Sequence, residues 1–281
     1  MQAPSEKWLQ EIIDAHAHLS ERSDDALNRF ARKNGLRYTL DELLGTMRRY
    51  KIVRGLLLSP PLQGGAPLPN DKVIKLCIRS GGMLAPVITV EPSAKEVKAA
   101  VKLAEENRRV VKAFKVRLGY VKASATSPVF DRLYDYAESE RLPVLFHTGD
   151  TAFSTGDLAR SHPLNLDGLA NKREELTIIL CHFGNPWFED VAELIYKHPN
   201  VYADISGLIT GGAYAEKYAG WLAKKISEAV YFAASADKVI FGTDYPVTKH
   251  SETLALVRKL EVDERDKEKI LWRNANRVFG L

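Results

Sequence analysis

Apolar, β-branched runs alternate with helical patterns along the whole chain, and this alternation limits the possible folds more than any other feature of the sequence. Runs that are apolar almost without interruption are typical of parallel strands buried on both faces of a sheet. The predicted strands cover residues 12–19, 53–60, 83–90, 110–117, 143–149, 176–184, 201–207 and 239–246. Eight strand–helix units in a chain of 281 residues predict an α/β fold, a (β/α)8 TIM barrel.

An open, doubly wound sheet is the alternative fold. It leads one to expect a glycine-rich phosphate loop directly after the first strand. This chain has "AHAHLSERS" at that place, which favours the barrel. No low-complexity linker divides the sequence, so we expect one domain over residues 1–281. The long segment over residues 20–51 predicts a helical insertion after the first strand.

Several predicted helices carry their own start signals. Thr39 in "TLDE" and Ser93 in "SAKE" have the spacing of capping boxes. In "SPVFDRL", Ser127 stands before Pro128, which is the order expected of a capping residue and the first helical position. These signals place helices between predicted strands, as a barrel requires.

Charge and composition argue against several classes of partner. The net charge of +4 arises from 40 basic and 36 acidic residues mixed along the chain, so no basic tract favours nucleic acid. No apolar run reaches transmembrane length, and the start "MQAPSEKWLQ" lacks the order of a signal peptide. Cys77 and Cys181 lie far apart in apolar surroundings and are expected as buried thiols. We therefore expect a cytoplasmic protein that binds no membrane.

Histidine, lysine and aspartate side chains fall at the ends of the predicted strands. They are His16 and His18 on the first strand, Lys115 on the fourth, His147 on the fifth, His182 on the sixth and Asp244 on the eighth. The carboxyl ends of parallel strands form one rim of a barrel, where TIM-barrel active sites are built. Imidazoles and a carboxylate that converge on one cavity are typical ligands of zinc or a similar divalent ion. Such an ion would also compensate the buried polarity of two histidines this close together.

Taken singly, each of these residues has an ordinary structural explanation. A lone buried histidine is more often hydrogen-bonded in a core than bound to metal, because buried polar groups find partners. Their common place at the ends of separate strands favours a shared site. For the other histidines we expect His198 at a surface helix end and His250 in a loop, while His162 is either structural or part of a cover over the substrate.

The motifs "DAHAH", "CHFGNPW" and "FGTDYP", with a histidine after the fifth strand, resemble the amidohydrolase superfamily. Within it, they are similar to the amidohydrolase-related branch of metal-dependent hydrolases and decarboxylases, whose carboxyl-terminal helix the closing "WRNANRVFGL" also resembles. The resemblance spans residues 14–281. It implies a metal-dependent TIM barrel that acts on a small molecule; whether it works as a monomer or a homo-oligomer stays open.

The resemblance implies roles for individual residues. His16, His18 and His147 are expected as metal ligands. Asp244 is expected as a further ligand that takes a proton from the metal-bound water, and His182 as a polarising or acid/base residue beside the metal. One divalent ion per chain, most simply zinc, follows from this ligand set.

Lys115 and Arg117 lie on one face of the fourth predicted strand. We expect the Lys115 ammonium to face the site and, with Arg117, to hold a substrate carboxylate. An outward-facing Arg117 is equally compatible with the sequence. In binuclear relatives a lysine at this strand is carboxylated and bridges two metals, so a carboxylated Lys115 with a second metal is the alternative that the resemblance leaves open.

Three functions stay open at this level. The first is a metal-dependent hydrolase, in which a metal-activated water attacks a small ester, lactone or amide. The second is a non-hydrolytic decarboxylase of an aromatic or unsaturated carboxylic acid. The third is a catalytically silent, ligand-binding barrel, against which the complete set of predicted ligands argues. A TatD-like nuclease is disfavoured, because "FKV" has no glutamate at the fourth strand.

Overall fold

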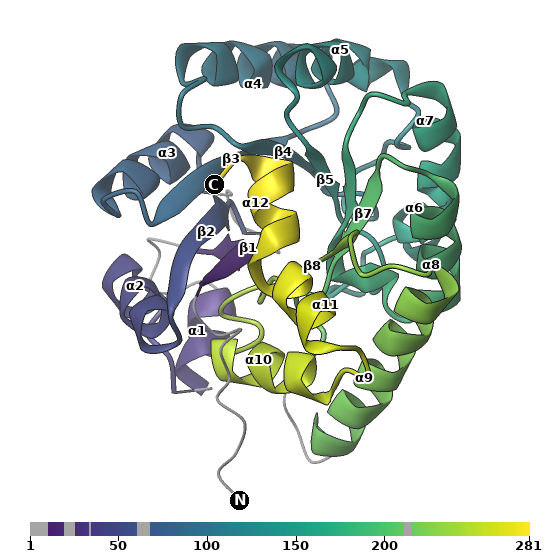
Figure 1. The fold of residues 1–281 in the computed structure, drawn as a ribbon. Helices are drawn as coiled ribbons and strands as arrows, with labels where there is room; N and C mark the ends of the chain where they lie inside the picture. Colours follow the sequence, from purple (N-terminus) through teal and green to yellow (C-terminus); the bar gives the residue numbers. More distant parts are fainter. Residues whose placement is uncertain (1–10, 20–25, 34, 61–67, 211–214) are drawn as a thin grey trace, which may run out of the picture.

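The computed structural model describes residues 11–19, 26–33, 35–60, 68–210 and 215–281. Eight parallel strands follow one another in sequence order around one sheet (Figure 1). They are β1 (Ile12–His18), β2 (Ile52–Leu58), β3 (Leu84–Val90), β4 (Ala113–Val116), β5 (Val144–Phe146), β6 (Ile178–Leu180), β7 (Val201–Asp204) and β8 (Val239–Ile240). Hydrogen bonds from Ala15 N to Phe241 O (3.0 Å) and from His18 N to Tyr245 O (2.8 Å) join the end of β8 to β1. The predicted TIM barrel is confirmed.

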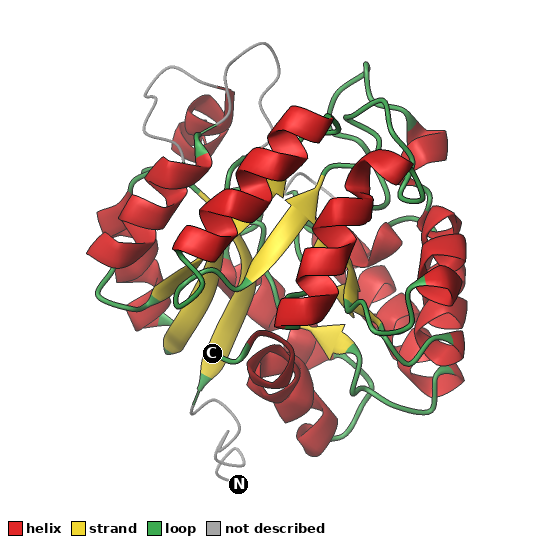
Figure 2. Cartoon of the chain, turned by 90° about the horizontal axis from the view of Figure 1, so that it is seen from above, coloured by secondary structure: helices red, strands yellow, loops and turns green. Residues whose placement is uncertain are grey.

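Helices follow the strands and cover the outside of the barrel (Figures 1 and 2). The α-helices are α1 (Ala26–Lys33), α2 (Leu40–Arg49), α3 (Asn70–Arg79), α4 (Ala94–Glu106), α5 (Asp131–Glu140), α6 (Leu158–Ser161), α7 (Asp167–Lys172), α8 (Phe188–Lys197), α9 (Ala215–Phe232), α10 (His250–Lys259), α11 (Glu264–Glu268) and α12 (Asn274–Phe279). Short helical turns are η2 (Pro128–Phe130), η3 (Pro163–Leu166), η4 (Cys181–Gly184) and η5 (Lys269–Arg273). Within the described ranges, no helix is long and apolar enough to span a bilayer.

The predicted insertion after the first strand contains two helices, α1 and α2. Residues 20–25 and 34 of this segment lie outside the described part of the chain. The Tyr245 hydroxyl donates to Arg37 O at 3.0 Å, which ties the segment to the loop after β8. The insertion therefore contacts the end of the barrel where the strands finish.

The capping predictions are confirmed at two of three helix starts. The hydroxyl of Thr39 accepts from Glu42 N at the start of α2, and the hydroxyl of Ser93 accepts from Glu96 N at the start of α4. The third prediction is confirmed only in position: Ser127 is the N-cap residue and Pro128 opens the 3₁₀ turn η2, but the Ser127 side chain makes no capping bond. Helix α5 begins after that turn, where the chain has already adopted helical geometry.

The strands bury two sets of apolar side chains. One set fills the inside of the barrel and includes Ile13, Leu56, Val87, Ala113, Leu145, Ile179 and Ile240, together with Ala275 and Phe279 of α12. The other set lies between the strands and the outer helices. Successive residues of a strand point to opposite sides, so strands that are apolar throughout supply both sets.

Helix α12 covers the end of the barrel where the strands begin. Asn274 donates to Val239 O at 2.8 Å, and Lys112 donates to Gly280 O at 2.9 Å, so both contacts join the carboxyl terminus to strand starts. Figure 1 shows α12 lying across the centre of the ring of strands. The opposite end, where the strands finish, carries the polar residues.

Several strands are shorter than predicted at this second end. Strands β5, β6 and β8 finish at Phe146, Leu180 and Ile240. The chain turns directly after them, and His182 (φ 61°) and Asp244 (φ 59°) take left-handed backbone conformations. His147, His182 and Asp244 therefore lie just beyond their strands, and strand alternation does not decide where they point, whereas His16, His18 and Lys115 lie within strands.

Candidate metal centre

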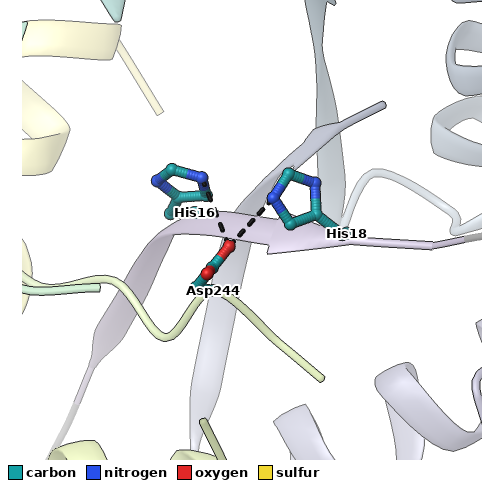
Figure 3. A group of neighbouring side chains, drawn as sticks. All are labelled: His16, His18 and Asp244. Carbon is teal, nitrogen blue, oxygen red and sulfur yellow. Dashed lines mark ion pairs between the residues drawn. The ribbon is translucent and has the colours of Figure 1, made fainter. Parts of the chain in front are cut away.

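His16 and His18, at the end of β1, form a compact group with Asp244, which follows β8 (Figure 3). Both histidines are buried. The Asp244 Oδ1 atom lies 2.9 Å from His18 Nε2 and 3.5 Å from His16 Nε2. The three candidate ligand atoms all lie within 4.8 Å of one another. Two imidazole nitrogens and a carboxylate oxygen at this spacing are suited to one divalent ion.

The hydrogen bonds of the two histidines fit a metal site. His16 Nδ1 lies 3.0 Å from Asp204 Oδ2, and His18 Nδ1 lies 3.1 Å from Leu58 O. Among the described residues, the buried His16 Nε2 has no hydrogen-bond partner. Metal-binding histidines pair their second ring nitrogen with a carboxylate or a carbonyl in this way. A divalent ion would use the nitrogen lone pair that the protein leaves unpaired.

The charges of the metal-free group follow from its burial and its contacts. Burial lowers the pKa of His18, which favours the neutral ring. Burial also opposes the ionised form of Asp244, but the hydrogen bond from His18 and the charges of the three neighbouring histidines together outweigh it and lower the pKa of Asp244. Burial and the Lys115 ammonium oppose a charge on His16, yet the Asp204 carboxylate raises the pKa of His16 to about 10.

Metal binding is expected to release one proton and to tighten as the pH rises. Below about pH 10, the ring of metal-free His16 is protonated on both nitrogens. At neutral pH, His18 is neutral and Asp244 is ionised. A metal must displace the His16 proton, so between pH 6 and pH 9 the apparent affinity should rise by roughly tenfold per pH unit. Isothermal titration with Zn²⁺ in buffers of different ionisation enthalpy measures the number of protons released. Binding that is independent of pH would contradict this assignment.

His182 borders the group from the turn η4 after β6. Its ring centre lies 5.0 Å from that of His16 and 4.8 Å from that of His147. His182 Nδ1 lies 3.0 Å from Ser206 Oγ and 3.2 Å from Ser206 O. Burial lowers the pKa of His182 to about 4, so the ring is neutral at physiological pH.

His147, directly after β5, lies beside His182 and outside the group of close ligand atoms. Its Nε2 atom is 3.0 Å from Asp150 O, and its ring centre is 4.7 Å from that of Tyr120. Burial, together with the neighbouring His182, lowers the pKa of His147 well below its usual value. Its role as a further metal ligand stays a prediction.

Lys115 and Arg117 occupy different surroundings. Lys115, on β4, is buried and its Nζ donates to Cys181 Sγ at 2.7 Å. Arg117, just beyond β4, pairs with the carboxylate of Glu91 and donates to Pro60 O at 3.3 Å. Arg117 is therefore anchored within the rim. It does not point outward to the surface, which was the alternative orientation that the sequence allowed. Both cysteines are buried thiols, as predicted.

Two residues that the sequence interpretation missed hold the histidines in place. Asp204, at the end of β7, and Ser206, just after it, are fully buried. Their side chains contact the Nδ1 atoms of His16 and His182. The signal was present, because Asp204 stands at the end of a predicted strand like the other polar residues. It was overlooked because an aspartate in "YADISG" is also a common turn residue.

The expectations for two histidines were wrong. His250 is the first residue of α10, is buried and contacts Asp14 Oδ2 at 3.2 Å. His198 does end a helix, but it is buried against Asp167 rather than placed at the surface. In both cases a carboxylate compensates the buried ring, and the carboxylate is distant in sequence. Asp14 in turn faces Thr243 and His250 and does not join His16 in the metal group.

An eight-stranded parallel barrel with imidazoles and a carboxylate gathered where its strands finish belongs to the TIM-barrel class with a candidate metal centre. The chain belongs to the amidohydrolase family, since the family model described as amidohydrolase matches residues 13–281. A search of curated protein sequences found no match.

Solved structures share the fold over nearly the whole chain. An uncharacterised TIM-barrel protein from Bordetella bronchiseptica is 21% identical with a TM-score of 0.75, covering 96% of this chain and 98% of that one. A probable 2-pyrone-4,6-dicarboxylic acid hydrolase from Acinetobacter baumannii, with citric acid bound, is 16% identical (TM-score 0.70, coverage 96% and 99%). A dihydroxybenzoic acid decarboxylase from Polaromonas sp. JS666, with bound manganese and 2-nitroresorcinol, is 15% identical (TM-score 0.69, coverage 97% and 97%).

Proposed function

We propose that the chain, as one amidohydrolase domain over residues 1–281, is a metal-dependent hydrolase of a small ester, lactone or amide. The observation that carries the proposal is the buried Nε2 of His16, which has no hydrogen-bond partner among the described residues and lies beside His18 Nε2 and Asp244 Oδ1. Family membership supports an enzyme. The manganese of the Polaromonas decarboxylase and the name of the Acinetobacter hydrolase support a divalent ion and hydrolysis of a small carbonyl compound.

His16, His18 and Asp244 would hold the ion, which we propose to be one zinc per chain, and His147 is proposed as the further ligand. A divalent ion lowers the pKa of a bound water from about 15.7 to roughly 7. Asp244 is ionised and is proposed to accept the proton of the attacking water.

His182 is proposed to transfer protons rather than to bind the substrate oxygen. Its Nδ1 faces two oxygen atoms of Ser206, which favours a hydrogen on Nδ1 and leaves Nε2 as an acceptor. His182 and Asp244 are neighbours, since His182 Nδ1 and Asp244 Oδ2 both lie close to the position that a Cβ atom would take at Gly207. We assign to His182 Nε2 the role of receiving the proton and passing it to the leaving group.

Lys115 and Arg117 are proposed as substrate contacts. After burial, the Lys115 ammonium is among the causes that oppose a positive charge on His16, His147 and His182, so its charge acts on the site. Glu91 and Pro60 occupy the two ends of the Arg117 guanidinium, while its buried Nε has no partner among the described residues. This N–H is the group that we assign to a substrate oxygen.

Lys115→Met is expected to leave the metal content unchanged. Lys115 Nζ donates to Cys181 Sγ at 2.7 Å, so its ammonium already has a partner other than a metal ligand. Removal of an ammonium that binds substrate raises KM, whereas removal of a carboxylated bridging lysine lowers the metal content. Elemental analysis of wild type and variant separates the two: a fall from two ions per chain to one or none would establish the bridge instead.

A decarboxylase of an aromatic acid is the second candidate. The ring of Tyr120 lies 4.7 Å from His147 and 5.7 Å from Phe153 and so places an aromatic wall beside the histidines. Aromatic rings pack on such walls in offset or edge-to-face geometry. The name of the Polaromonas neighbour supports the same chemistry.

Metal content and product analysis test the proposal together. Protein purified without added metal is analysed for bound ions and then assayed with Zn²⁺ or Mn²⁺ after chelator treatment. Acid release from lactones and esters that depends on the ion supports the hydrolase, while carbon dioxide release from aromatic acids supports the decarboxylase. Less than about one-tenth of an ion per chain, with ligand binding insensitive to chelator, would identify a silent barrel.

A further inference from the structure

We propose that Asp204 is a positioning residue that fixes the ring of His16 in its metal-binding form, a role that rests on the proposed metal centre. Asp204 lies at the end of β7, which only β8 separates from the strand that carries His16 and His18. It is fully buried, and a buried carboxylate is retained only where several donors surround it.

The donors around Asp204 fix its orientation. Its Oδ1 atom accepts from His182 N and Ser206 N, both at 3.0 Å, and from the Ser206 hydroxyl. Its Oδ2 atom is 3.0 Å from His16 Nδ1. Because two of the donors are backbone N–H groups, which cannot reverse their polarity, Oδ1 must stay where it is and Oδ2 must face His16.

This arrangement determines which nitrogen of His16 keeps its hydrogen once a metal has displaced the other one. Within the described ranges, the hydrogen-bond partners of His16 Nδ1 are Asp204 Oδ2 and Ser206 Oγ, and the single hydrogen of Ser206 is donated to Asp204. Both atoms therefore act as acceptors toward His16. In the neutral ring, Nδ1 carries the hydrogen and Nε2 presents its lone pair to the side where His18 and Asp244 lie.

Replacing Asp204 with asparagine changes the group at the Oδ2 position from a hydrogen-bond acceptor to a donor. The asparagine oxygen must keep the Oδ1 position, since the backbone N–H groups of His182 and Ser206 point at it. The amide nitrogen then takes the Oδ2 position and directs its hydrogens at His16 Nδ1. His16 is expected to move its hydrogen to Nε2, and a protonated Nε2 cannot bind a metal.

Asp14→Asn is the matched control. Asp14 is equally buried, and its Oδ1 also accepts from two backbone N–H groups, those of His16 (3.1 Å) and Thr243 (2.9 Å). Its second oxygen faces Thr243 and His250 instead of the His16 ring. This variant removes the same charge from the same region and leaves the acceptors around His16 Nδ1 unchanged.

The test measures the Zn²⁺ dissociation constant by competition with a chromophoric chelator, together with the melting temperature of each metal-free protein. Asp204→Asn should weaken Zn²⁺ binding by about 10- to 100-fold or more, as the loss of such partners does elsewhere, while Asp14→Asn lowers the melting temperature and keeps the dissociation constant. In a His16→Gln background, Asp204→Asn should cause no further loss, because the ring through which it acts is gone.

Each other outcome overturns a defined statement. Equal Zn²⁺ affinity in wild type and Asp204→Asn, or equal losses in both aspartate variants, would overturn the positioning role and leave the metal centre in place. If Asp204→Asn weakens Zn²⁺ binding in the His16→Gln background as much as in the wild type, Asp204 does not act through His16. Wild-type protein that binds no Zn²⁺ would overturn the metal centre itself, which separates that failure from a failure of Asp204.

Discussion

His16→Ala is expected to lose bound metal and turnover together. The variant removes the one buried ring nitrogen of the group that has no hydrogen-bond partner within the described chain. It leaves only His18 and Asp244 close together. Metal chemistry contributes several kcal/mol to such reactions, and a loss of about 4 kcal/mol corresponds to roughly a thousandfold in rate. Elemental analysis and steady-state kinetics on the same preparation measure both effects.

His182→Ala is the informative comparison for that variant. His182 lies outside the group of close ligand atoms, so the variant should keep its metal while turnover falls by about a hundredfold or more, as for loss of a general acid–base group. Loss of metal in both variants would make His182 a ligand. Turnover retained in both would move the site elsewhere in the molecule.

The fold could be predicted because its signal is spread over the whole chain. Strands that supply both the inner core, with Leu56 and Val87, and the outer core, with Leu57 and Ile88, must be apolar at consecutive positions. No turn or single side chain changes that pattern. The strand ends were less predictable, because the backbone leaves the sheet wherever a local turn competes with pairing, as it does after Leu180 and Ile240.

The candidate metal group could be predicted only in part. His16, His18 and Asp244 were found because strand ends converge at one rim. The detailed contacts were not, since they depend on turn conformations such as φ 61° at His182, which bring its Nδ1 to Ser206. The pairing of His250 with Asp14 spans most of the chain, and a single sequence contains no spacing rule for such a contact.

The charges of the site were also beyond sequence interpretation. His16, His147 and His182 are the same residue type, yet the Asp204 carboxylate raises the pKa of His16, while burial lowers the pKa of the other two. The difference depends on distances of a few ångströms between residues on different strands. Asp204, which the sequence analysis did not identify, therefore affects the protonation of His16, which the sequence had already indicated as a metal ligand.

Gly207→Ala is expected to reduce turnover by about a hundredfold, although Gly207 contributes no functional group. A methyl group at this position would lie 2.8 Å from Asp244 Oδ2, closer than real contacts allow, and 3.0 Å from His182 Nδ1, tighter than most real contacts. Both side chains would have to shift. A displacement of about 1 Å in a catalytic group can cost 10²-fold in rate.

Gly81→Ala separates this displacement from backbone strain. Gly207 and Gly81 share a φ of +67°, so alanine introduces the same left-handed strain of roughly 1–2 kcal/mol at both positions. At Gly81 the added methyl meets no heavy atom of the described chain within 4 Å. Both variants should therefore lose a similar amount of stability from backbone strain, which thermal unfolding measures. Gly207→Ala should lose more in total, because its methyl group is also crowded. Only Gly207→Ala should lose turnover, because only there does the methyl group occupy the space that Asp244 and His182 need. Equal activity in the two variants would mean that neither side chain is required where the structure places it.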